Sequence, residues 1–130
     1  MMVLRAFFAG LVAVMLLGSV AASAAETKAY SPEALAQAKE SGKPVLVEVY
    51  AAWCSVCRAQ SPIVQALTGE PKYKDLIVFK ADFDKDKSDL KALDVRQQST
   101  LILYKDGEEI DRSVGDTSAF SIEAMLDKTF

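Results

Sequence analysis

Hydrophobic and polar positions after residue 30 follow first a helix-like and then a strand-like spacing. Ser31 offers an N-cap and Pro32 fills the first helical position, so a helix is predicted over residues 32–40. The residues over 45–50 are β-branched, aliphatic or aromatic, with one acid among them, and predict a central strand.

The middle of the chain again predicts a helix followed by a strand. Helix-like apolar spacing runs from Cys54 to Thr68 and passes through Pro62, which is expected to kink the helix. Leu76–Lys80 predicts a second strand that continues toward Asp84. The charged residues 82–89 predict a solvated loop, at the end of which Ser88 is expected to cap a short helix reaching residue 93.

The C-terminal third predicts a hairpin followed by a helix. Residues 100–104 and 109–114 form the two strands, joined by a turn that contains Gly107. After Gly115, Ser121 is expected to cap a final helix whose buried face carries three residues: Ile122, Met125 and Leu126. This order predicts a single α/β domain with a mixed central sheet and helices on both faces.

The N-terminus has the pattern of a secretory signal peptide. Arg5 precedes an apolar run over residues 6–20, and Ala22-Ser23-Ala24 supplies a small-x-small cleavage site. We therefore predict a signal peptide over residues 1–24, cleavage before Ala25, a mature domain over residues 25–130 without a membrane span, and a periplasmic or otherwise exported location. An uncleaved N-terminal anchor is the alternative.

Charge narrows the choice of partners. The chain carries 15 basic and 18 acidic residues, and loss of Arg5 with the leader leaves 14 against 18, a net charge of −4. There is no basic run that would bind nucleic acid and no Lys/Arg-rich amphipathic stretch for a membrane surface. Proteins or small thiols are the expected partners.

The chain has only two cysteines, Cys54 and Cys57, and they stand at the predicted junction of a strand and a helix. Unpaired amide groups and the helix dipole at a helix N-terminus favour a thiolate over a thiol, so Cys54 is the expected nucleophile. Cys57 lies one helical turn later, where it can attack a mixed disulfide on Cys54 and act as the resolving residue.

In this arrangement the sequence resembles the thioredoxin superfamily along nearly the whole mature chain. The resemblance rests on the strand over residues 45–50, the run Ala51-Ala52-Trp53-Cys54-Ser55-Val56-Cys57, the helix proline Pro62, the strand residues 78–82 and the segment 95–115. The lead-in Gly42-Lys43-Pro44 and the run from Tyr50 to Cys54 are most similar to the exported domain of transmembrane disulfide reductases.

The resemblance implies a thioredoxin fold and a monomeric thiol-disulfide oxidoreductase without a cofactor. It implies reduction of disulfides in exported proteins and reduction of the enzyme by a membrane or periplasmic electron donor. Six residues before Cys54, Glu48 occupies the position of the family's buried acid, and Lys80 matches the lysine that accompanies it. The acid would accept or relay the proton of the resolving thiol. A surface pair of Glu48 with Lys80 is the alternative.

Four further residues are expected to face the substrate: Trp53, Ser99, Thr100 and Gly115. Ser99 departs from the family, which places a cis-proline there. Because a cis bond before a residue other than proline costs about 2.5–4 kcal/mol, the Gln98–Ser99 peptide is predicted to be trans or rearranged. The Ser99 hydroxyl is a possible hydrogen-bond partner for a thiolate.

Other functions stay open at this point. Oxidation or isomerisation uses the same two thiols, and the direction depends on the reduction potential. Cys-x-x-Cys also supplies half of a four-thiolate site, so two chains are able to share a metal ion or an iron-sulfur cluster. The third alternative is a redox-inactive binding module on the same scaffold.

Overall fold

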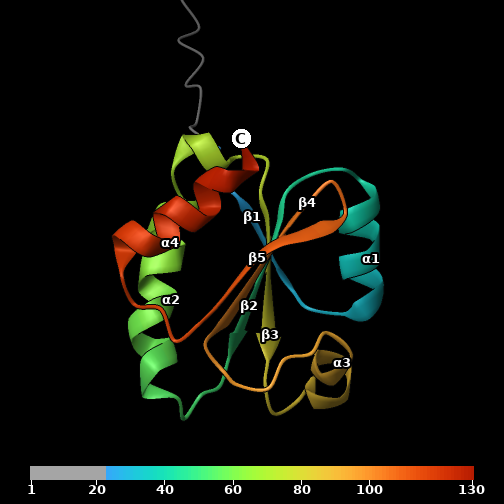
Figure 1. Cartoon of the computed structure of the whole chain (residues 1–130), viewed down its shortest axis with the longest axis vertical. Coiled ribbons are helices and arrows are strands. Elements are labelled where there is room, and N and C mark those ends of the chain that lie inside the picture. Colours follow the sequence, from blue (N-terminus) through green and yellow to red (C-terminus); the bar gives the residue numbers. More distant parts are fainter. Residues whose placement is uncertain (1–22) are drawn as a thin grey trace, which may run out of the picture.

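The computed structural model describes residues 23–130, so the predicted signal peptide lies outside the described residues except for its last two positions. A five-stranded sheet forms the centre of the molecule (Figure 1). Its strands, in chain order, are β1 (Glu26–Ala29), β2 (Val45–Tyr50), β3 (Ile77–Asp82), β4 (Thr100–Lys105) and β5 (Glu108–Val114).

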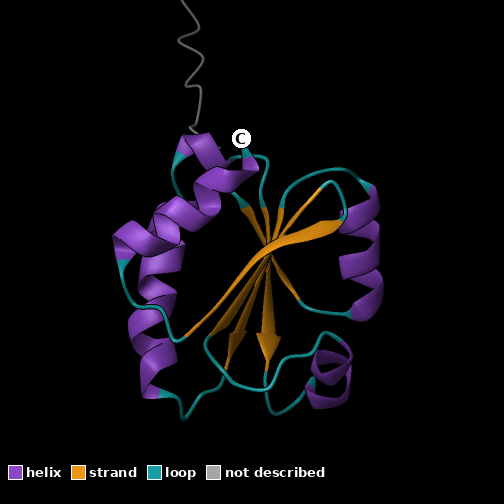
Figure 2. Cartoon of the chain, in the orientation of Figure 1, coloured by secondary structure: helices purple, strands orange, loops and turns teal. Residues whose placement is uncertain are grey.

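The strands lie in the order β1-β3-β2-β4-β5. β3 pairs in parallel with both β1 and β2, whereas β4 is antiparallel to both β2 and β5. The helices α1 (Pro32–Glu40) and α3 (Lys87–Ala92) cover one face, and α2 (Ser55–Thr68) and α4 (Ala119–Leu126) cover the other (Figure 2). The predicted α/β class and the mixed sheet between helices are confirmed.

The elements that lead to the cysteines have the predicted bounds. α1 covers residues 32–40, and the Ser31 side chain caps it by accepting a hydrogen bond from the Ala34 N–H at 3.1 Å. β2 covers residues 45–50. α2 begins directly after Cys54, which is its N-cap, and it ends at Thr68 with Pro62 inside it.

One strand was not predicted. The four residues of β1 are all exposed and show no alternation of apolar and polar side chains, so the sequence pattern gives no sign of a strand. Backbone pairing with β3 holds this strand at the edge of the sheet. Two 3₁₀ helices, Pro71–Tyr73 and Asp127–Thr129, were also not predicted.

The predicted caps of the last two helices are wrong. α3 begins at Lys87, one residue before Ser88, and its N-cap is Asp86. α4 begins at Ala119 with Ser118 as its cap, because the Ser118 hydroxyl accepts from the Ser121 N–H at 3.3 Å. The Ser121 hydroxyl instead donates to the carboxylate of Asp116.

The acidic stretch after β3 is more ordered than a solvated loop. The Asp82 side chain accepts from the N–H groups of Asp84 and Lys85 at 3.0 and 3.1 Å. The Asp86 carboxylate accepts from the Asp82 N–H at 2.8 Å. These carboxylates close the turn between β3 and α3, so residues 82–89 hold a strand end and a helix start as well as a turn.

The hairpin is confirmed, with strands that each extend one residue further into the turn than predicted. Asp106 and Gly107 form the turn with φ values of 51° and 78°. Positive φ at both central residues is the geometry of a type I′ hairpin turn, for which Asp-Gly is a preferred pair.

β2 separates two hydrophobic cores because its side chains alternate between the two faces of the sheet. Val45, Val47 and Val49 pack toward α1 and α3. Leu46 packs with residues of α2 and α4, and Glu48 shares this side of the strand. Glu48 therefore lies beneath the helix that carries the cysteines.

Candidate active site

Cys54 and Cys57 form a disulfide at the N-terminus of α2, with their Cα atoms 5.3 Å apart. The Cys54 sulfur caps the helix by accepting from the Cys57 N–H at 3.1 Å. Both cysteines are buried, at 3% and 4% exposure. A sulfur held at a helix N-terminus with an amide donor is placed where a negative charge is stabilised.

Trp53 lies beside the disulfide and is 60% exposed. Its indole N–H donates to the Asp84 carboxylate at 2.8 Å, which fixes the ring against the turn after β3. The structure thus presents a large, oriented aromatic surface next to Cys54.

Glu48 is buried at 3% exposure, in agreement with the predicted buried acid and not with a surface pair. One carboxylate oxygen accepts from the Ser61 hydroxyl at 2.5 Å and lies 3.8 Å from the Lys80 ammonium nitrogen. Lys80 is partly exposed and also lies over the Tyr50 ring, 5.0 Å from its centroid. Ser61 comes from α2, one turn after Cys57, so it links the acid to the cysteine helix.

A cavity of about 210 Å³ opens beside this carboxylate, on the side of the sheet covered by α2. Its lining includes Thr27, Glu48, Ser61, Val64, Val78 and Lys80. The buried acid therefore borders an open space.

Ser99 contacts the disulfide, with its hydroxyl oxygen 3.7 Å from the Cys54 sulfur. No peptide bond within residues 23–130 is cis, so the Gln98–Ser99 bond is trans, as predicted. Ser99 itself has φ 58°, in the left-handed region that residues other than glycine rarely adopt.

Of the two remaining predicted residues, Gly115 bonds the Ser99 backbone and Thr100 bonds elsewhere in the loop. The Gly115 N–H donates to the Ser99 carbonyl at 3.0 Å, and Gly115 itself has φ 74°. Thr100 is buried at the start of β4, where its hydroxyl donates to the Gln97 carbonyl at 2.7 Å. The structure therefore brings Ser99, Gly115 and Cys54 together, whereas the Thr100 hydroxyl is used within the loop.

Sequence reasoning missed Gln60, which is buried in α2 at 1% exposure. Its amide donates to the carbonyls of Ser99 and Asp116, at 3.2 and 2.8 Å. The signal was present in the sequence, because Gln60 follows Cys57 by three residues and precedes Val64 by four, on the stripe that faces the core. A polar residue on such a stripe needs internal hydrogen-bond partners.

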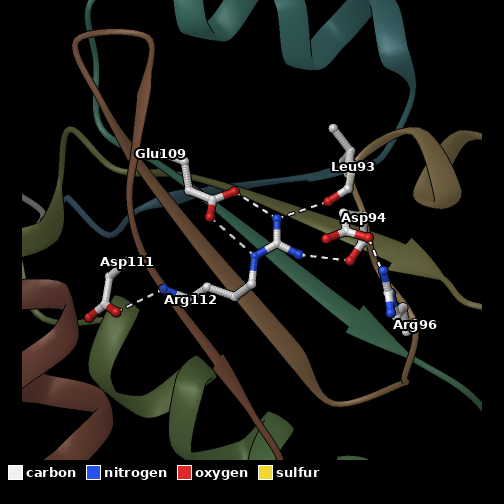
Figure 3. A network of polar contacts seen from close by, with 6 residues as sticks. All are labelled: Leu93, Asp94, Arg96, Glu109, Asp111 and Arg112. Atoms are coloured by element: carbon white, nitrogen blue, oxygen red, sulfur yellow. Dashed lines mark hydrogen bonds and ion pairs between the residues drawn. The ribbon is translucent and has the colours of Figure 1, made fainter.

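Arg112 of β5 holds the start of the segment that leads to Ser99 (Figure 3). Its guanidinium group donates to the carbonyls of Leu93 and Asp94 at 2.8 and 3.1 Å, and it pairs with the Glu109 carboxylate at 2.6 Å. The hydrogen bond to Glu109 raises the pKa of Arg112 above its ordinary value. Asp94 has φ 55°, so the arginine fixes a second strained turn before Ser99.

Comparison with known proteins agrees with this geometry. The thioredoxin family model matches residues 24–128. The chain belongs to the thioredoxin family. A thioredoxin of Chlamydia muridarum is 36% identical over 84 residues, which cover 65% of this chain and 80% of that protein.

Solved structures show the same similarity. Trxlp from Edwardsiella tarda is 46% identical with a TM-score of 0.76, over 78% of this chain and 98% of that one. A mutant thioredoxin from Halobacterium salinarum is 27% identical with a TM-score of 0.71, over 84% of this chain and 95% of that one. A thioredoxin with its Cys-x-x-Cys pair at disulfide distance is a thiol-disulfide oxidoreductase, and this chain is one.

The part of the chain that the structure describes contains neither a membrane-spanning helix nor a cluster of metal ligands. Within residues 23–130 no helix has the length and apolarity needed to cross a membrane. The same residues contain no group of three or more cysteine, aspartate or glutamate side chains arranged to hold a metal ion.

Proposed function

We propose that this thioredoxin-family protein is an exported, monomeric reductase of disulfides in other exported proteins, with Cys54 as nucleophile and Cys57 as resolving thiol. The observation that supports these roles best is the hydrogen bond from the Cys57 N–H to the Cys54 sulfur at the N-terminus of α2. It is a donor that a Cys54 thiolate uses and that a neutral thiol uses less well.

The reaction transfers two electrons. The Cys54 thiolate attacks one sulfur of the substrate disulfide, forms a mixed disulfide and releases the other substrate sulfur as a thiolate, which takes up a proton. Cys57 then loses its proton and attacks the Cys54 sulfur, which breaks the mixed disulfide and releases the second substrate thiol. The substrate gains two electrons and two protons, and the enzyme keeps the Cys54–Cys57 disulfide.

Glu48 is proposed as the group that accepts the Cys57 proton, with Lys80 and Ser61 holding its carboxylate. Burial at 3% exposure supports this role, because the carboxylate is shielded from bulk water except through the cavity that it borders. The cavity of about 210 Å³ bordered by Glu48 and Lys80 gives the proton a route to solvent.

Export is proposed from the leader pattern and from where the domain begins. Ala25, the first residue after the predicted cleavage site, donates its N–H to the Thr68 carbonyl at 3.0 Å, and β1 starts at Glu26. Cleavage before Ala25 would therefore leave every strand and helix of the described domain intact.

The reducing direction requires an electron donor in the same compartment, either a membrane protein or a periplasmic thiol protein. Trp53 precedes Cys54 in the chain, the Ser99 hydroxyl lies 3.7 Å from its sulfur, and Gly115 bonds the Ser99 carbonyl. These three residues are the proposed contact surface for donor and substrate, with Thr100 at its edge. A reductase is held mainly as the dithiol by its donor, whereas an oxidant is held mainly as the disulfide.

Alkylation of acid-quenched cells tests direction and location together. We expect most of the protein in the periplasmic fraction, with Ala25 as its N-terminal residue by mass spectrometry and with both cysteines alkylated as free thiols. A steady-state disulfide would contradict the reducing direction, and an intact Met1 chain in the cytoplasmic fraction would contradict export.

A further inference from the structure

We propose that the Ser99 hydroxyl is a second hydrogen-bond donor to the Cys54 thiolate and that Gln60 is the positioning residue that directs it there. The proposal rests on the proposed role of Cys54 as nucleophile. It assigns a function to the serine that stands where the family has proline, and to a buried glutamine of the same helix.

The surroundings of the Ser99 hydroxyl leave it one partner. Ser99 is 4% exposed, and within residues 23–130 its hydroxyl has no hydrogen-bond partner except the Cys54 sulfur at 3.7 Å. A disulfide sulfur is a weak acceptor, whereas a thiolate is a charged and much stronger one. The contact therefore strengthens when the disulfide is reduced, and the serine gives no proton away.

Three hydrogen bonds hold the backbone of Ser99. Its N–H donates to the Val49 carbonyl at 2.8 Å, and its carbonyl accepts from the Gly115 N–H at 3.0 Å and from the Gln60 amide at 3.2 Å. A serine at φ 58° persists only where surrounding contacts determine it. These three bonds fix the position from which the hydroxyl reaches Cys54.

Gln60 bonds two separate loops, the one that contains Ser99 and the one that contains Asp116. Its side-chain nitrogen donates to the carbonyls of Ser99 and Asp116, and the residue is 1% exposed. Because Gln60 lies in α2, six residues after the Cys54 cap, the helix that carries the nucleophile also sets the distance between the sulfur and Ser99.

The reduced protein then has two donors on the Cys54 sulfur, the Cys57 N–H and the Ser99 hydroxyl. Stabilising the thiolate favours the reduced state over the disulfide, so the couple becomes more oxidising than it is without the hydroxyl.

Two substitutions at Ser99 distinguish the effect of the hydroxyl group from the effect of the strained backbone. Ser99→Ala removes the hydroxyl and keeps the strained backbone, whereas Ser99→Gly removes it and relieves the strain. In a Cys57→Ser background, where Cys54 alone titrates as a thiol, ultraviolet absorbance should show about tenfold less thiolate in both variants at a pH below the ionisation midpoint. In the two-cysteine protein, equilibrium with glutathione should shift toward the disulfide by up to about tenfold.

Gln60→Leu tests the positioning role, with Gln37→Leu, an exposed glutamine of α1, as the matched control. Gln60→Leu should reduce the thiolate fraction severalfold in the same direction, and Gln37→Leu should leave it unchanged. Unchanged thiolate in both Ser99 variants would overturn the role of the hydroxyl, and unchanged thiolate in folded Gln60→Leu would overturn the role of the glutamine. These titrations use no substrate, so a wild-type protein that reduces no protein disulfide would refute the proposed function separately.

Discussion

The Glu48 carboxylate and the Lys80 ammonium group lie 3.8 Å apart on neighbouring strands, with the acid buried and the lysine partly exposed. The pairing follows from the parallel register of β2 and β3, in which the two residues are direct partners. The buried carboxylate thus has one charged partner and one hydroxyl donor, Ser61. Its proposed role requires that it be available to accept the Cys57 proton.

Glu48→Gln tests that availability. The amide keeps the size of the side chain but cannot accept a proton, so reduction of a protein disulfide should slow by about tenfold at neutral pH, and its pH profile should change shape. Turnover measured from pH 5 to 9 checks this. Glu108→Gln, an exposed acid in the hairpin, is the matched control and should behave as wild type. An unchanged profile for Glu48→Gln would refute the proton role.

Trp53→Ala tests the contact surface. The ring is 60% exposed and held by Asp84, so its loss removes an oriented aromatic face beside Cys54 at little cost in stability. We expect KM for a protein disulfide to rise severalfold with a smaller change in kcat. Phe130→Ala, an aromatic 69% exposed at the C-terminus, should leave KM unchanged. Equal KM values for the two variants would argue against a substrate contact at Trp53.

Arg112→Met tests whether the loop before Ser99 is held from β5. The substitution removes hydrogen bonds to two carbonyls and to Glu109, and should lower the free energy of unfolding by about 1–2 kcal/mol and speed amide exchange over residues 94–99. Arg96→Met is the control, because Arg96 is highly exposed and, in the described part of the chain, pairs only with Asp94 (Figure 3). Its effect should stay below about 0.5 kcal/mol. Equal exchange in the two variants would show that Arg112 does not hold the loop.

Tyr30 predicts an alkaline limit to stability. Burial, followed by the nearby Asp89 carboxylate, raises the pKa of Tyr30 to about 12. An unfolded tyrosine has a pKa of about 10. The folded state therefore keeps the proton longer, and the stabilisation is complete below pH 10 and is lost as the pH rises toward 12.

Tyr30→Phe removes this titration. As the pH rises from 10 to 12, the free energy of unfolding should fall in both proteins, and the fall should be smaller in the variant by on the order of 1 kcal/mol. Urea unfolding at several pH values measures this difference. Identical losses in the two proteins would show that Tyr30 does not contribute to the alkaline limit.

Most of the fold followed from local patterns, and the exceptions have physical causes. α1 and β2 match their predicted bounds because a serine-proline start and a β-branched run are strong local signals. β1 was missed because it is held by pairing with β3 and not by a buried face. The caps at Ser88 and Ser121 were wrong because neighbouring residues, Asp86 and Ser118, occupy those positions in three dimensions.

The residues of the candidate active site were also predicted only in part. The cysteine pair, Glu48 and Lys80 were found from spacing and from the family resemblance, and the structure brings each pair together. Gln60 was not found, because its partners are the backbone carbonyls of Ser99 and Asp116, 39 and 56 residues away. The position of Gln60 on the core-facing stripe of α2 indicates a buried polar residue, but a single sequence does not reveal which distant backbone atoms it bonds.

The most direct test of the central claim is to trap the first intermediate with Cys57→Ser. Without the resolving thiol, the account predicts that a substrate protein stays joined to the variant through Cys54, as seen by mass spectrometry of the linked peptides, and that reducing agent releases it. Cys54→Ser should trap far less. Trapping through Cys57 in Cys54→Ser at an equal level, or no mixed disulfide in either variant, would contradict the assignment of Cys54 as nucleophile.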